Sequence, residues 1–167
     1  MKTKEITEYA ILLALAFVCS YLEAQLPILV SVPGVKLGLA NIMTMLVFYR
    51  KTPAKAYIFM CCRVFLTSMV FSGISMLIFS FAGGSLCILM MWLVRKLKCF
   101  SMLGVSMMGA VFHNVGQIAV ACFVMENAHI FYYLPVLCMT GLFSGFLIGY
   151  ISYLLVTQLN KNFPKDC

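Results

Sequence analysis

The sequence predicts an all-α integral membrane protein, a bundle of six transmembrane helices with its N- and C-termini in the cytoplasm. Hydrophobic residues make up 63% of the 167 residues and charged residues only 10%. A soluble domain has about 45–50% apolar and about 25% charged residues, and one of this length could not bury so much apolar surface. The apolar residues also form continuous runs of helix length, unlike the alternating pattern of β-barrel strands.

Six apolar runs are the expected spans. A helix that crosses the roughly 30 Å hydrocarbon layer needs about 20 apolar residues. The runs lie at about 6–26, 37–50, 54–72, 74–94, 102–125 and 133–157. The second run is short. The first could be mistaken for a signal peptide, but its only A-x-A lies inside the apolar run instead of after it, so we expect this run to stay as a membrane helix. No polar segment is long enough for a separate soluble domain, and residues 1–167 should form a single six-helix domain.

Basic residues flank these runs on one side of the membrane. Ten of the twelve Lys and Arg residues fall there: Lys2, Lys4, Arg50, Lys51, Lys55, Arg95, Lys96, Lys98, Lys161 and Lys165. The positive-inside rule makes this the cytoplasmic side of a multi-pass plasma-membrane protein. The net charge of +7 is therefore an orientation signal. No basic face with interleaved aromatic residues predicts nucleic-acid binding.

Residues for catalysis or metal binding are scarce. The five acidic residues are too few and too scattered for the magnesium sites of phosphoryl or diphosphate chemistry. No G-x-x-x-x-G-K-[ST] loop for nucleotide hydrolysis occurs, and the eight cysteines include no C-x-x-C pair, which favours buried free thiols. A Ser/His arrangement around His113 stays open, although no aspartate is placed to orient it. We expect no enzyme activity, no cofactor and no metal.

Polar side chains within the apolar runs are the candidate binding site. They are Glu23, Asn41, Arg63, His113, Asn114 and Gln117. Such residues are costly in a bilayer and usually face the bundle interior, where they bind ligands or relay charge. His113 and Gln117 are one turn apart and share a helix face. The structural alternative is that Asn114 ties two helices together and that Arg63 pairs with Glu23.

Small residues mark two further faces. Gly141, Gly145 and Gly149 repeat every four residues in the last run, which favours close packing within the bundle. Ala10 and Ala14 repeat in the same way in the first run. The alanines can pack inside the bundle or receive a helix of another protein.

Five stretches carry a family resemblance that spans nearly the whole chain. They are VPGVKLGLANIMTMLVFY, CRVFLTSMVFSG, FSFAGGSLCILMMWL, GVSMMGAVFHNVGQIAVA and YYLPVLCMTGLFSGFLIG. With them, the chain resembles the Gx transporter family, also labelled heptaprenyl diphosphate synthase component I. The six short spans, the A-x-x-x-A of the first and the long first outer loop are similar to substrate-binding S-components of energy-coupling factor (ECF) transporters.

The resemblance implies a function. An S-component captures a small molecule from outside and works with a membrane scaffold subunit and two ATPase subunits, here in a bacterial cell. Pro33 and Gly34 would belong to a lid over the pocket, with Lys36 at its mouth. Lys36, Arg63 and His113 would meet an anionic or carbonyl-bearing ligand. The amides would orient it: Asn41, Asn114 and Gln117. The ligand class stays open between a vitamin, a flavin, a quinone precursor and an isoprenoid precursor.

Two other functions remain open at this stage. The chain could be the non-catalytic membrane subunit of an enzyme of prenyl-diphosphate or quinone metabolism. It could also be a structural subunit of a membrane redox complex, although it has no C-x-x-C-H motif and no paired histidines for haem. A soluble catalytic partner would favour the first of these, and co-purified ATPases would oppose it.

Overall fold

Helices account for nearly all of the described residues. The computed structural model describes residues 3–25 and 38–162, and no strand occurs among them. In chain order the elements are α1 (Thr3–Gln25), α2 (Leu39–Arg50), α3 (Pro53–Thr67), the π-helical turn η2 (Ser68–Ser72), α4 (Gly73–Lys96), α5 (Met102–Val124), the 3₁₀ segment η3 (Ala128–Tyr133) and α6 (Leu134–Asn162). The prediction of an all-helical fold is confirmed over these residues.

Five helical stretches are long and apolar enough to cross a membrane. They are Glu5–Gln25, Pro53–Phe71, Ser75–Lys96, Met102–Val124 and Ala128–Lys161. The remaining helix, α2, has 12 residues, and at 1.5 Å per residue it rises only about 18 Å. The described part of the predicted span at 37–50 is therefore too short to cross the roughly 30 Å hydrocarbon layer. The lengths and compositions of the other five indicate a multi-pass membrane protein.

Local interactions explain where several helices begin and end. Thr52 caps α3 by accepting a hydrogen bond from the backbone N–H of Lys55, with Pro53 in the first turn. Ser101 caps α5 in the same way. The predicted run at 54–72 is correct in extent, but its last five residues form η2. Gly73, with φ at 77°, then turns the chain into α4, a conformation that glycine adopts easily.

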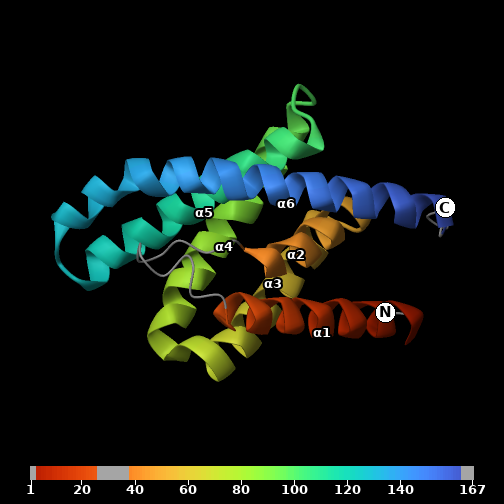
Figure 1. Cartoon of the computed structure of the whole chain (residues 1–167), viewed down its shortest axis with the longest axis horizontal. Coiled ribbons are helices and arrows are strands. Elements are labelled where there is room, and N and C mark those ends of the chain that lie inside the picture. Colours follow the sequence, from red (N-terminus) through yellow and green to blue (C-terminus); the bar gives the residue numbers. More distant parts are fainter. Residues whose placement is uncertain (1–2, 26–37, 163–167) are drawn as a thin grey trace.

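The start of α1 and the end of α6 are on the same side of the fold. Thr3 and Asn162 lie at the same end of the molecule, whereas η3, which joins α5 to α6, lies at the opposite end (Figure 1). The placement of both termini on the cytoplasmic side stays a prediction, because five of the described helical stretches are long enough to cross a membrane and α2 is not.

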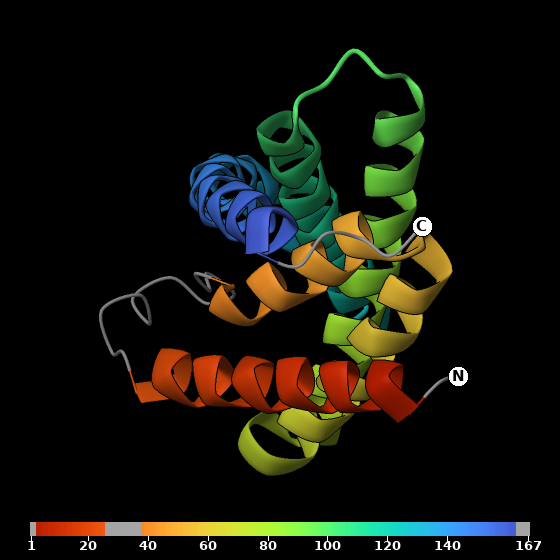
Figure 2. The ribbon, with the colours of Figure 1, turned by 90° about the vertical axis from the view of Figure 1, so that its right-hand side faces the viewer.

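α2 forms the centre of the fold. It contacts α1, α3 and α6, and in the rotated view it lies between α1 and the α5–α6 pair (Figure 2). Its residues from Thr44 to Phe48 are all buried. Arg95 fixes the C-terminal end of α2, because its guanidinium donates a 2.9 Å hydrogen bond to the carbonyl of Phe48 and lies 4.6 Å from the ring centroid of Tyr49. The helix too short to span is thus held on several sides by longer helices.

The glycine series of α6 packs against α5. A β-carbon at Gly145 would lie 2.8 Å from the Cα of Met107, and one at Gly149 would lie 2.9 Å from the Cβ of Ser106. Both distances are below ordinary carbon–carbon contact, so only glycine lets the two backbones approach this closely. The prediction that these glycines pack within the bundle is confirmed.

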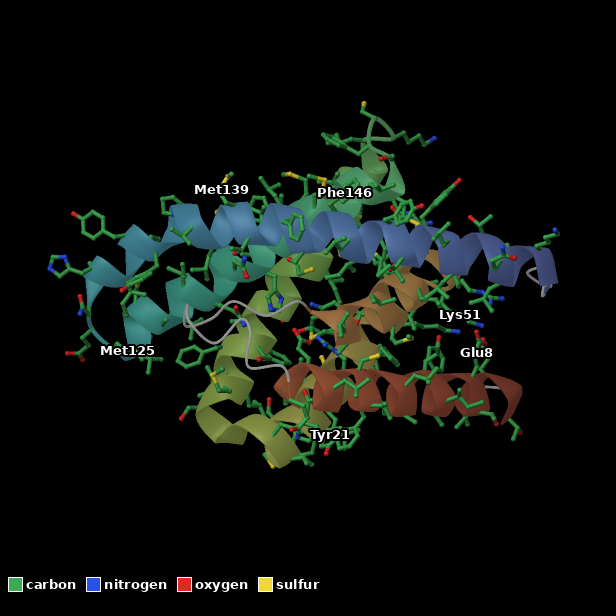
Figure 3. The ribbon with its side chains drawn as sticks, in the orientation of Figure 1. Glu8, Tyr21, Lys51, Met125, Met139 and Phe146 are labelled. Carbon is green, nitrogen blue, oxygen red and sulfur yellow. The ribbon has the colours of Figure 1, made fainter. Side chains whose placement is uncertain are left out.

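Two ion pairs attach the N-terminal end of α1 to the region where α2 ends and α3 begins. The Nζ of Lys51 lies 2.8 Å from a carboxylate oxygen of Glu8, and the Nζ of Lys55 lies 3.1 Å from Glu5. Glu8 and Lys51 point toward one another in Figure 3, where Met139 and Phe146 point outward from α6. Among the α1 side chains that the structure describes, Ala16 alone is fully buried, so most of this helix surface is open to lipid or to a partner.

Candidate functional site

Arg63 is the charged side chain at the centre of the candidate site. It lies on α3, only 9% of its surface is exposed, and its Nε has no hydrogen-bond partner among the described residues. Cys87 on α4 and Glu23 on α1 are its electrostatic neighbours, and no hydrogen bond or ion pair joins Arg63 to either of these described residues. A buried guanidinium costs free energy unless hydrogen-bond acceptors surround it. Arg63 therefore has a donor available for an acceptor that approaches through the bundle.

Glu23 binds the start of α2. Its carboxylate accepts a hydrogen bond from the backbone N–H of Gly38, the residue that caps α2. Among the described residues Glu23 and Arg63 do not form an ion pair, although their charges interact. The alternative in which Arg63 is neutralised by direct contact with Glu23 is therefore not found in the described part of the chain.

Asn41 completes this group at the N-terminal end of α2. A β-carbon at Gly38 would lie 3.0 Å from Nδ2 of Asn41 and 3.1 Å from Cδ1 of Ile148 on α6. Gly38 also has φ at 75°, in the left-handed region that favours glycine. Space and backbone conformation together require glycine here. Glu23, Gly38 and Asn41 thus form one cluster at the junction of α1, α2 and α6.

His113 and Gln117 form a second group where α5 crosses α4. A β-carbon at Gly83 would lie 2.7 Å from the carbonyl oxygen of His113, 3.2 Å from Cε1 of its ring and 2.8 Å from Cγ of Gln117. On the other side of the crossing, a β-carbon at Gly116 would lie 3.0 Å from the Cα of Gly83. The two glycines let α4 and α5 meet at their backbones, and the partly buried His113 and Gln117 lie beside this contact.

One face of α4 connects the two groups. Gly83, which contacts His113, and Cys87, which interacts with Arg63, are four residues apart. Residues at this spacing on a helix are neighbours, with about 5–6 Å between their Cβ positions. Arg63 and His113 therefore adjoin successive turns of α4. The candidate site thus has a cation, an imidazole and an amide beside one face of α4, and each of these groups carries a hydrogen-bond donor.

Asn114 points away from this face, toward α6. Its Nδ2 donates a 2.6 Å hydrogen bond to the backbone carbonyl of Leu137 and lies 2.7 Å from the β-carbon position of Gly141. It therefore ties α5 to α6, as the structural alternative proposed. Its place in the binding site stays a prediction that rests on its carbonyl oxygen alone.

The structure describes the predicted docking face on α1 but not the predicted lid. Pro33, Gly34 and Lys36 lie outside the described residues. Ala10 and Ala14 are both exposed on α1, beside Ile11 and Leu15, which are 57% and 46% exposed. The two alanines thus form a shallow strip on an outward face, whereas Leu12 and Leu13 pack against the core.

Three residues that contribute to the site were missed in the sequence. Gly38 holds Glu23, Gly83 makes room for His113, and Cys87 adjoins Arg63. The adjacent glycines of FAGGS in the middle of an apolar run were a usable signal, because glycine is costly inside a helix unless a backbone approaches. Among the described residues, no group of three His, Cys, Asp or Glu side chains could hold a metal ion.

Comparison with known proteins gives one match. The sequence profile of a family described as heptaprenyl diphosphate synthase component I matches residues 12–155. No curated protein and no solved structure matches this chain. The matched range includes every described residue of the candidate site and Ala14, but not Ala10.

Proposed function

This chain belongs to the heptaprenyl diphosphate synthase component I family, and from that premise we propose that it is a non-catalytic membrane subunit that binds a small molecule for partner proteins. More specifically, it acts as the substrate-binding component of an ECF-type importer. Partner subunits, a membrane scaffold and two ATPases, drive the release of the captured molecule into the cell.

The buried Arg63 is the observation that supports this proposal best. A guanidinium has five N–H donors in a planar fork that matches carboxylate and phosphate oxygens. At Arg63 the described neighbours supply a thiol and a carboxylate that is already bound to Gly38. An anionic or carbonyl-bearing ligand would supply the missing acceptor. His113 and Gln117, one α4 turn away, would then bind its other polar atoms.

The family description itself favours a second function. It names a component of a synthase, so the chain could anchor a soluble prenyl synthase subunit at the membrane. The few carboxylates in the chain do not fit prenyl transfer by this subunit, because magnesium-dependent diphosphate chemistry needs several of them together. Purification of the tagged chain in mild detergent separates the two functions: two co-purified ATPases support the importer, and a prenyl synthase subunit in their place contradicts it.

The exposed strip of Ala10 and Ala14 leads to a prediction about the scaffold. Helix association in lipid depends on close van der Waals contact, which small residues allow. Ala14→Trp should therefore reduce co-purified scaffold at least about tenfold, the effect of losing about 1.4 kcal/mol of contact. Ligand affinity of the isolated variant should be unchanged, because Ala14 is exposed and lies far along α1 from Glu23.

Leu15→Trp is the matched control. It introduces the same side chain one residue away, at a position that is already large and 46% exposed, and it should leave scaffold binding near the parent level. Equal scaffold recovery from both variants, or loss of ligand binding together with scaffold in the Ala14 variant, would rule out this docking face.

A further inference from the structure

An apolar groove runs along the outer seam of α3 and α4, away from the candidate site. Its volume is about 490 Å³, and its walls include Pro53 and Tyr57 of α3 and Ser85, Leu89 and Trp92 of α4. The hydroxyls of Tyr57 and Ser85 lie 3.3 Å apart and bond to each other. These two hydroxyls thus satisfy each other, and the mostly apolar remaining surface suits a hydrocarbon chain.

The groove lies in the cytoplasmic half of the membrane. α3 begins at Pro53 and α4 ends at Lys96, both at the side that the basic residues mark as cytoplasmic. Ser85, the innermost wall residue of α4, is eleven residues from Lys96, or about 16 Å along the helix. The groove therefore extends from the interface toward the midplane, parallel to the acyl chains of the inner leaflet.

A cation stands at the interfacial end of this groove. The Nζ of Lys96 lies 3.8 Å from the centroid of the Trp92 ring, which forms part of the wall. Of the other basic residues at this end of the helices, Lys51 and Lys55 are paired with Glu8 and Glu5, and Arg95 is bonded to the carbonyl of Phe48. Lys96 is exposed, and a cation–π contact leaves ammonium protons free to bind an anion.

We propose that this groove is a binding site for an anionic phospholipid of the cytoplasmic leaflet. One acyl chain lies in the groove between Tyr57 and Leu89, and the headgroup phosphate binds Lys96 beside Trp92. The match is one of charge and depth: a phosphodiester carries a single negative charge, and one ammonium meets it where the groove reaches the interface. Basic residues at this level of a membrane protein attract anionic lipids. The inference is independent of the importer proposal, because none of these residues belongs to the candidate site.

A polyprenyl diphosphate is the competing occupant. It also joins an apolar chain to phosphate, but a diphosphate carries more charge and is usually held by several converging cations or by magnesium. At the wall of this groove the described contacts bring a single lysine to the aromatic ring. The phospholipid is therefore the better match.

The sequence offers a direct probe of occupancy, because Trp92 is its single tryptophan. The full chain is reconstituted into phosphatidylcholine vesicles that contain increasing fractions of phosphatidylglycerol with brominated acyl chains, and quenching of Trp92 fluorescence is followed. Phosphatidylcholine with the same brominated chains is the reference. We expect phosphatidylglycerol to reach half-maximal quenching at an about fivefold lower mole fraction, since one lysine near anionic lipid contributes about 1 kcal/mol. Equal quenching by the two lipids overturns the proposal.

Two variants and one competitor separate the causes. Lys96→Gln should abolish the preference for phosphatidylglycerol, whereas Lys161→Gln, which removes the same charge from the exposed end of α6, should keep it. Quenching is expressed relative to each variant in unbrominated lipid, because Lys96 touches the ring. A preference that survives in Lys96→Gln overturns the proposal. The proposal is also overturned if farnesyl diphosphate reverses the quenching at a lower mole fraction than that of the brominated phosphatidylglycerol. That result would identify a prenyl diphosphate site.

Discussion

Replacing Arg63 with methionine is expected to weaken ligand binding by about 10- to 100-fold while leaving the empty protein at least as stable as the parent. A hydrogen bond to a charged group contributes about 1.5–3 kcal/mol, and each 1.4 kcal/mol is a factor of ten in affinity. The stability of the empty protein should not fall, because a buried charge without a close counter-ion costs free energy that an apolar side chain of similar length avoids.

The opposite signs of these two effects make the experiment decisive for Arg63. If Arg63 held the bundle together, its removal would lower thermal stability and ligand affinity in parallel. Affinity is measured with whichever compound stabilises the parent in a thermal-shift screen of flavins, other water-soluble vitamins, quinone precursors and short prenyl diphosphates. His113→Ala should also weaken binding of this compound, but by less than Arg63→Met does, because a neutral hydrogen bond contributes about 0.5–1.5 kcal/mol.

Arg95→Met is the matched control. Arg95 donates to the carbonyl of Phe48 and lies over the ring of Tyr49, so its loss should lower the melting temperature and leave affinity unchanged. If Arg63→Met behaves like Arg95→Met, the residue is structural and the proposed site is wrong.

The second large effect is expected at the α5–α6 interface. Gly145→Leu should destabilise the protein by more than the 1–3 kcal/mol or so that overpacking of a core typically costs. Even a β-carbon would lie 2.8 Å from the Cα of Met107 and 2.9 Å from the Cβ of Ala110, and neither backbone nor β-carbon can move without shifting α5. Because His113 lies on α5, ligand binding should fall together with stability.

Phe146→Leu supplies the comparison for this interface. Phe146 is the next residue on α6, it points outward (Figure 3) and it is 46% exposed. The melting temperature of the Phe146→Leu variant in detergent should stay within about 2 °C of that of the parent, since substitutions at exposed positions usually change stability by at most about 0.5 kcal/mol. A Gly145→Leu variant as stable as Phe146→Leu would show that the two helices are not in close contact.

The features that the sequence predicted depend on composition and spacing along one helix. Run length and hydropathy located the helices to within a few residues, and the four-residue glycine repeat of Gly141, Gly145 and Gly149 identified a packing face. These properties survive without knowledge of which helices are neighbours. The basic residues likewise predicted that both termini lie on the cytoplasmic side. The start of α1 and the end of α6 lie at one end of the molecule (Figure 1), and their side of the membrane stays a prediction.

Features that depend on contacts between helices could not be predicted. Glu23 binds Gly38 across α1 and α2 instead of pairing directly with Arg63, and nothing in the spacing of these residues shows that choice. The role of α2 could not be predicted for the same reason. Its apolar residues are buried by neighbouring helices, and hydropathy does not distinguish burial in protein from burial in lipid. Asn114 was equally suited to ligand or helix contact until its bond to Leu137 was seen.

Native mass spectrometry of the intact protein, parent and Arg63→Met side by side, tests the central claim most directly. The importer proposal predicts that the parent carries one anionic small molecule per chain and that the variant, folded and equally stable, carries at least about tenfold less of it. The same bound small molecules at the same occupancy in both proteins would contradict a ligand site at Arg63. So would a parent that binds a soluble prenyl synthase subunit and none of the small molecules supplied.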